Sequence, residues 1–77
     1  MKLEIFGTGC TKCKRLSKNV EKAVKEMGAD AQISKVEDVN EIVSRGIMMT
    51  PGLAVDGEIK VLGRVPSVEE IKDILSG

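Results

Sequence analysis

The chain has 77 residues, 42% of them hydrophobic and 31% charged, and its formal net charge at pH 7 is zero. This composition predicts a single globular domain, 1–77, because a chain of this size buries only about 60% of its unfolded surface and has no room for a second core. A neutral chain has no excess of cations for phosphate contacts, so we expect no nucleic-acid partner. The sequence contains no histidine, which excludes His-based catalysis and His-ligated metals.

The N-terminal sequence and the two cysteines indicate the cellular location and the kind of site to expect. The first six residues carry charges and are too short for the apolar core of a signal peptide, and no segment is long enough to span a membrane. We therefore expect a cytoplasmic monomer with no membrane partner. A disulfide between Cys10 and Cys13 would close almost no loop and would stabilise the fold little, so a reactive or metal-binding pair is favoured over a structural one.

The first half of the chain predicts alternating strands and helices. Residues 2–6 alternate as in a strand, and 11–27 form a long amphipathic helix that ends at Gly28. Segment 31–36 is typical of a second strand, and 38–45 of a short helix. A right-handed crossover makes the two strands parallel. The apolar side of the long helix is predicted to consist of Cys13, Leu16, Val20, Ala23, Val24 and Met27.

The second half predicts an antiparallel hairpin and a final helix. Segments 53–55 and 58–62 flank Asp56-Gly57, a two-residue hairpin signal. Ser67 is the expected N-cap of the last helix, with Glu70 as its capping-box partner. The buried side of this helix is predicted to be Val68, Ile71, Ile74 and Leu75. The order is therefore βαβαββα, an α/β fold with a four-stranded mixed sheet flanked by three helices.

With this order the chain resembles the thioredoxin-fold superfamily, and most of all the small, glutaredoxin-sized "redox-active disulfide" proteins of archaea and bacteria. Three features carry the resemblance, which covers essentially the whole chain. A strand runs into Cys10-Thr11-Lys12-Cys13 at a helix start, Thr50-Pro51 precedes the third strand, and a turn containing Gly63 precedes the last helix. The family's proline is typically cis, so the resemblance implies a cis Thr50–Pro51 bond facing the cysteines.

The chain also departs from its better-known relatives. Thioredoxins have Trp-Cys-Gly-Pro-Cys, whereas here Gly9 precedes the motif and Thr11-Lys12 lie inside it. Glutaredoxins have a tyrosine in the motif and a Gly-Gly-x-Asp-like turn that holds glutathione, and here the turn reads Leu62-Gly63-Arg64-Val65. The redox potential of thioredoxins and the glutathione specificity of glutaredoxins are therefore not transferred to this chain.

The motif predicts a reaction centre with two unequal thiols. Cys10, at the helix start among basic side chains, is the expected nucleophile, because the helix dipole and positive charge favour a thiolate. Cys13, on the apolar side of the helix, is the expected resolving thiol. Thr50 is expected to present its backbone to a bound peptide as an added strand. The predicted substrate-binding residues are Gly9, Thr11, Lys12, Thr50, Pro51 and Gly63.

Four other residues have two interpretations. Glu4 lies six residues before Cys10, where thioredoxins have a buried carboxylate that is assigned to proton transfer. Because burial of a carboxylate is costly, we expect Glu4 to be an exposed strand residue instead. Gly7, like Gly9, is expected to allow a tight loop rather than to bind phosphate, because the chain has no G-x-G-x-x-G or Walker pattern. Met48 and Met49 either present a pliable apolar surface near the thiols or fill the core.

These observations predict a thiol–disulfide oxidoreductase that reduces protein disulfides without a cofactor or a metal. Its partners would be disulfide-containing proteins and, as electron donor, a reductase or a low-molecular-weight thiol. One alternative is a carrier of Cu(I) or another soft metal, which thiolates bind well, although such carriers run βαββαβ and end on a strand. The other is a non-catalytic redox sensor with the same pair of cysteines.

Overall fold

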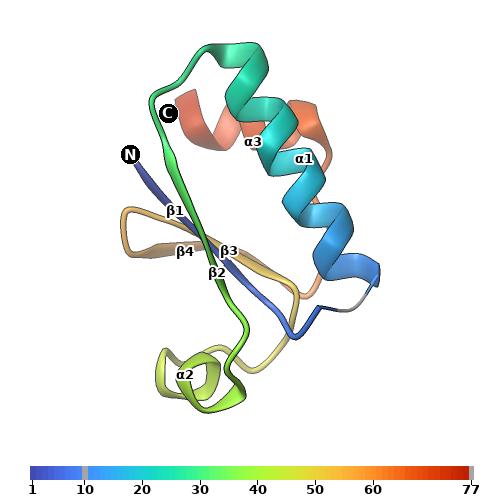
Figure 1. Ribbon diagram of the computed structural model, residues 1–77, viewed down its shortest axis with the longest axis vertical. Coiled ribbons are helices and arrows are strands. Elements are labelled where there is room, and N and C mark those ends of the chain that lie inside the picture. The colour runs from blue at the N-terminus through green and yellow to red at the C-terminus, as the bar shows by residue number, and fades with distance from the viewer. Residues whose placement is uncertain (10, 77) are drawn as a thin grey trace.

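Residues 1–9 and 11–76 are described by a computed structural model, and within them strands and helices follow the predicted order (Figure 1). The strands are β1 (Lys2–Phe6), β2 (Gln32–Val36), β3 (Gly52–Val55) and β4 (Glu58–Leu62). The helices are α1 (Thr11–Met27), α2 (Val39–Ser44) and α3 (Val68–Ser76). The fold class is therefore the predicted thioredoxin-like α/β fold. Across the described ranges, no helix has the length and apolar character needed to cross a membrane.

The sheet is mixed, with the strand order β2-β1-β3-β4. β1 runs parallel to β2 and antiparallel to β3, and β4 returns antiparallel to β3. Asp56 and Gly57, at the centre of the β3–β4 turn, both have positive φ, at 50° and 86°. A tight hairpin turn requires such angles, which explains the Asp-Gly pair in the sequence. Both strand pairings predicted from the sequence are confirmed.

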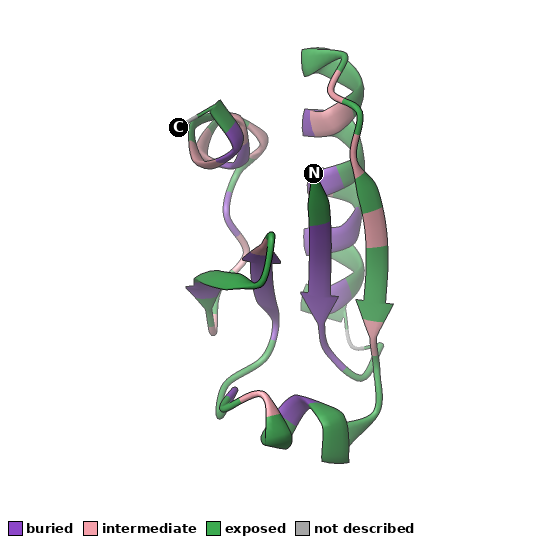
Figure 2. Ribbon diagram, turned by 90° about the vertical axis from the view of Figure 1, so that its left-hand side faces the viewer, coloured by how far each residue is buried: buried purple, intermediate pink, exposed green. Residues whose placement is uncertain are grey.

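The core has two parts, one on each face of the sheet. On one face Leu3, Ile5 and Leu53 pack with α1 and α3. On the other face Phe6 and Ala54 pack with Ile42 of α2 and its neighbour Ile47. Every residue of β1 after Lys2 is buried as a result, as Figure 2 shows. The strand that leads into the cysteine motif is thus held from both faces.

Side chains cap the starts of two helices, and two of the sequence expectations for the helices are wrong. Asp38 caps α2, where its side chain accepts a hydrogen bond from the Asn40 backbone nitrogen at 2.9 Å. Ser67 caps α3, with its hydroxyl accepting from the Glu70 nitrogen at 3.1 Å. The capping-box role of the Glu70 side chain is wrong, because this carboxylate pairs with Arg64 instead. Met27, expected on the apolar side of α1, is exposed at the end of that helix.

Candidate functional site

Two loops of the predicted site leave the sheet at the same end. β1 ends at Phe6, which lies opposite Gly52, the first residue of β3. The segment after Phe6 leads into the cysteine motif, and the segment before Gly52 contains Thr50–Pro51. This peptide bond is cis, as the resemblance implied. Pro51 is buried while Thr50 is exposed, so the loop presents Thr50 to solvent.

Gly63 lies against the loop that carries the cis-proline. Its backbone nitrogen donates a hydrogen bond to the Pro51 carbonyl oxygen at 2.8 Å. Gly63 has a left-handed φ of 75°, and a Cβ at this position would lie 2.7 Å from Cε of Met49. Met48 and Met49 are 94% and 60% exposed, so their use as core filling is wrong. The turn after β4 and this loop therefore form one surface with exposed methionines.

Cys13 is buried in the first turn of α1, with 6% of its surface exposed. A Cβ added to Gly7 would lie 2.2 Å from its Sγ and 2.9 Å from its Cβ. The Gly7 backbone nitrogen donates to the Val36 carbonyl oxygen at 3.0 Å and so extends the pairing of β1 with β2. Gly7 is therefore needed for close packing of the second cysteine on the end of the sheet. The sequence interpretation, a tight loop, missed this contact.

Cys10, the predicted nucleophile, precedes α1 in the sequence and lies outside the described residues. Its neighbours Gly9, Thr11 and Lys12 are exposed. Among residues 1–9 and 11–76, no three His, Cys, Asp or Glu side chains are grouped so as to hold a metal ion. The described part of the motif is thus an exposed segment that ends in the shielded Cys13.

A cleft of about 120 Å³ lies beside Cys13, between α1 and the end of β2. Because β2 and β3 flank β1 on opposite sides, this cleft and the cis-proline loop lie on opposite sides of the central strand. Cys13 therefore borders a cleft that is separate from the cis-proline loop. The polar residues that line the cleft are Lys14, Ser17, Lys35 and Glu37.

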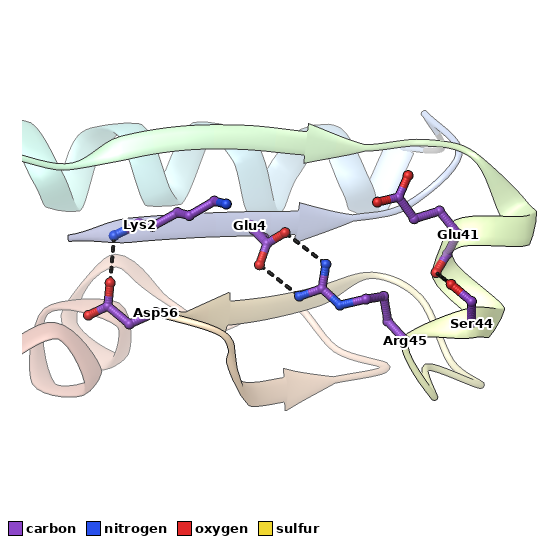
Figure 3. A network of polar contacts seen from close by, with 6 residues as sticks. All are labelled: Lys2, Glu4, Glu41, Ser44, Arg45 and Asp56. Carbon is purple, nitrogen blue, oxygen red and sulfur yellow. Dashed lines mark hydrogen bonds and ion pairs between the residues drawn. The ribbon is translucent and has the colours of Figure 1, made fainter.

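Glu4 is buried, with 7% of its surface exposed, and the expectation of an exposed residue is wrong. Its two carboxylate oxygens accept hydrogen bonds from the guanidinium group of Arg45 at 2.8 and 3.0 Å (Figure 3). The same guanidinium lies 5.2 Å from the centre of the Phe6 ring, so the aromatic ring also faces the cation. Burial of the carboxylate is tolerated because a charged partner satisfies both oxygens.

The ion pair determines the charge of Glu4. The hydrogen bonds from Arg45 hold the pKa of this carboxyl below its ordinary value, although burial acts in the opposite direction. Glu4 therefore carries no proton in neutral solution. It also shares its face of β1 with Phe6 and α2, whereas Cys13 belongs to α1 on the other face. The ion pair with Glu4 therefore links Arg45, the residue after α2, to the central strand.

Comparison with known proteins agrees with this geometry. Residues 1–76 match the thioredoxin domain family. The chain is 54% identical over 76 residues to a thioredoxin of Methanothermobacter thermautotrophicus, with 99% of each chain covered. It is 55% identical over 73 residues to a thioredoxin of Methanocaldococcus jannaschii, with 95% of this chain and 84% of that protein covered. The chain therefore belongs to the thioredoxin domain family and is a thioredoxin-like redox protein.

Proposed function

We propose that the protein is a monomeric thiol–disulfide oxidoreductase that reduces protein disulfides through Cys10 and Cys13 and needs no cofactor. The observation that supports this most directly is the position of Cys13. Its sulfur is buried against Gly7 at the end of β1, at the end of the sheet where Pro51 and Gly63 meet. A second thiol shielded in this way suits a resolving role, because external disulfides reach it less easily than a thiol at the helix start.

The reaction is two successive thiol–disulfide exchanges. The Cys10 thiolate attacks one sulfur of the target disulfide, which forms a mixed disulfide and releases the other target sulfur as a thiolate. Cys13 then loses its proton, and its thiolate attacks the Cys10 sulfur and releases the remaining target thiolate. Two electrons pass to the target, whose thiolates take up two protons, and the protein is left with a Cys10–Cys13 disulfide. A reductase or a low-molecular-weight thiol returns the two electrons.

Target binding would use the exposed residues on both sides of the motif. Thr50 is exposed beside Pro51, and its backbone would pair with an extended segment of the target. Gly9, Thr11 and Lys12 would contact the target near the mixed disulfide, and Gly63 would keep the loop of Pro51 in place. A reducing, cytoplasmic setting favours the reductive direction.

Trapping of the mixed disulfide tests this function. Cys13→Ser removes the resolving thiol, so adducts with a disulfide-bearing protein such as insulin should accumulate and survive non-reducing electrophoresis. Cys10→Ser should give none, and the unaltered protein should accelerate insulin reduction by dithiothreitol. A Cu(I) carrier would lose metal binding equally with either substitution and trap nothing. A redox sensor would form its disulfide without accelerating insulin reduction.

A further inference from the structure

The exposed side of α1 carries a row of cations. At 3.6 residues per turn, five basic residues fall within an arc of about 100° on this helix and extend for about 17 Å along its axis. All of them are exposed, on the side away from the buried Leu16 and Val20. We call this row the basic stripe, and its members are Lys14, Arg15, Lys18, Lys22 and Lys25.

The charge of the basic stripe is only partly offset within the described part of the chain. None of its five cations forms an ion pair with another described residue, whereas Arg45, Arg64 and Lys72 all do. Of the two acidic residues of α1, Glu26 pairs with Lys72 of α3 and also lies near Lys22, whose charge lowers the pKa of Glu26. The other, Glu21, lies three residues after Lys18 and four before Lys25 on the helix surface. Since the whole chain is formally neutral, the remainder of the molecule is acidic on balance. Like charges four residues apart on a helix repel one another, so the stripe is unfavourable for the isolated helix.

The basic stripe begins at the reaction site. Lys14 follows Cys13 directly and lines the same cleft. We propose that the basic stripe is a docking surface for an acidic protein, namely a target whose disulfide is bordered by Asp and Glu side chains. This inference rests on the proposed function and specifies its substrate class. The row of cations would attract such a target and align its disulfide with the start of α1.

The dimensions and composition of the stripe favour a protein target over two other anionic partners. A low-molecular-weight thiol could contact one or two cations at a time, not a row of about 17 Å. An anionic membrane is the other candidate, but membrane-binding helices insert an apolar side, and the apolar side of α1 is buried against the sheet. An acidic protein surface needs only charge complementarity.

Matched disulfide peptides test the proposal. Two synthetic peptides carry the same cysteine joined by a disulfide to a chromogenic thiol, and differ in a neighbouring run of six residues, all Glu or all Gln, which spans about 20 Å when extended. The second-order rate constant for chromophore release by the reduced protein is measured at about 10 mM and about 1 M salt, where the screening lengths are about 30 and 3 Å. We expect the Glu peptide to react at least about tenfold faster at low salt and to lose this advantage at high salt.

A pair of double variants locates the effect. Lys18→Gln/Lys22→Gln removes two stripe cations away from the cysteines, and Lys2→Gln/Lys60→Gln removes two cations outside α1. The first should slow the Glu peptide about threefold or more at low salt and leave the Gln peptide unchanged, whereas the second should slow the Glu peptide clearly less than the first does. Equal rates for the two peptides at low salt, or equal losses in the two variants, would overturn the proposal. So would a stripe-dependent affinity for phosphatidylserine vesicles without any preference for the Glu peptide.

A binding measurement separates this inference from the proposed function. A cysteine-free peptide of six glutamates with a fluorescent label should bind the unaltered protein more tightly than the Lys18→Gln/Lys22→Gln variant, as measured by anisotropy. If neither disulfide peptide were reduced, the proposed function would fail and the anisotropy would still decide the charge preference. If both were reduced at one rate and the anisotropy showed no difference between the variants, the docking surface would be refuted and the oxidoreductase would stand.

Discussion

A single methyl group added at Gly7 should both destabilise the fold and slow the reaction of Cys13, because Gly7 contacts this cysteine closely. In Gly7→Ala the new Cβ would lie 2.2 Å from Sγ of Cys13, whereas such atoms are ordinarily about 3.5–4.0 Å apart. The sulfur must therefore move by more than about 1 Å. Rotation of the Cys13 side chain alone does not relieve the overlap, because its Cβ would also lie only 2.9 Å away. Either the first turn of α1 or the end of β1 has to shift.

The size of the effect follows from this overlap. Overpacking of a well-packed site costs about 1–3 kcal/mol of unfolding free energy. For a domain of this size, that lowers Tm by roughly 5–20 °C. A displacement of about 1 Å at a reacting sulfur should slow the resolving step on the order of 100-fold. Urea unfolding measures the first effect, and the decay rate of a mixed disulfide with a small peptide measures the second.

A second glycine provides the control for Gly7→Ala. Gly28 has a φ of 63°, and a Cβ there would meet nothing within 4 Å. Gly28→Ala should therefore cost backbone strain on the order of 1–2 kcal/mol without moving either thiol. If Gly7→Ala resolves its mixed disulfide as fast as Gly28→Ala does, the packing argument for Gly7 is refuted.

Two further variants test the ion pair and the cis-proline loop. Because the pKa of Glu4 is lowered in the folded protein, its contribution to stability is present above pH 4.5 and is lost as the pH falls through the lowered value. Glu4→Gln should therefore make the unfolding free energy fall less steeply as the pH is lowered. If the unfolding free energy depended on acidic pH in the same way in the variant and the unaltered protein, this prediction would be wrong. Gly63→Ala strains the left-handed backbone and brings a Cβ to 2.7 Å from Met49 Cε, so KM for a peptide disulfide should rise several-fold. An unchanged KM would separate Gly63 from target binding.

The order of elements could be predicted because local signals agree with the tertiary structure. Asp56-Gly57 predicts a hairpin, and both residues adopt the angles that this turn requires. Ser67 predicts the start of α3 in the same way, because as the N-cap its hydroxyl accepts a hydrogen bond from the Glu70 backbone nitrogen. The resemblance added the cis bond at Pro51, which no local pattern indicates. Of the candidate site, Pro51 and Gly63 are brought together, while the prediction for Cys10 lies outside the described residues.

Contacts between distant segments could not be predicted in this way. The sequence marks Gly7 as a flexible residue, but only the packing of α1 on β1 shows that Cys13 occupies the place of a side chain there. Glu70 matches the capping-box pattern, yet its carboxylate pairs with Arg64, six residues earlier. A pattern rule describes what a residue can do locally. It does not rank that option against a charged partner brought close by the fold.

Glu4 shows why position alone does not transfer a role within this family. Counting six residues back from Cys10 finds a carboxylate, and burial of that carboxylate agrees with the thioredoxin pattern. Its chemistry, however, is determined by Arg45, which lies 41 residues further along the chain and bonds both oxygens. A carboxylate whose pKa is lowered by a guanidinium is a weak base, and so a poor acceptor for a thiol proton. In the proposed reaction the proton that Cys13 loses would therefore need another acceptor, and the side chain of Glu37 lines the cleft beside Cys13.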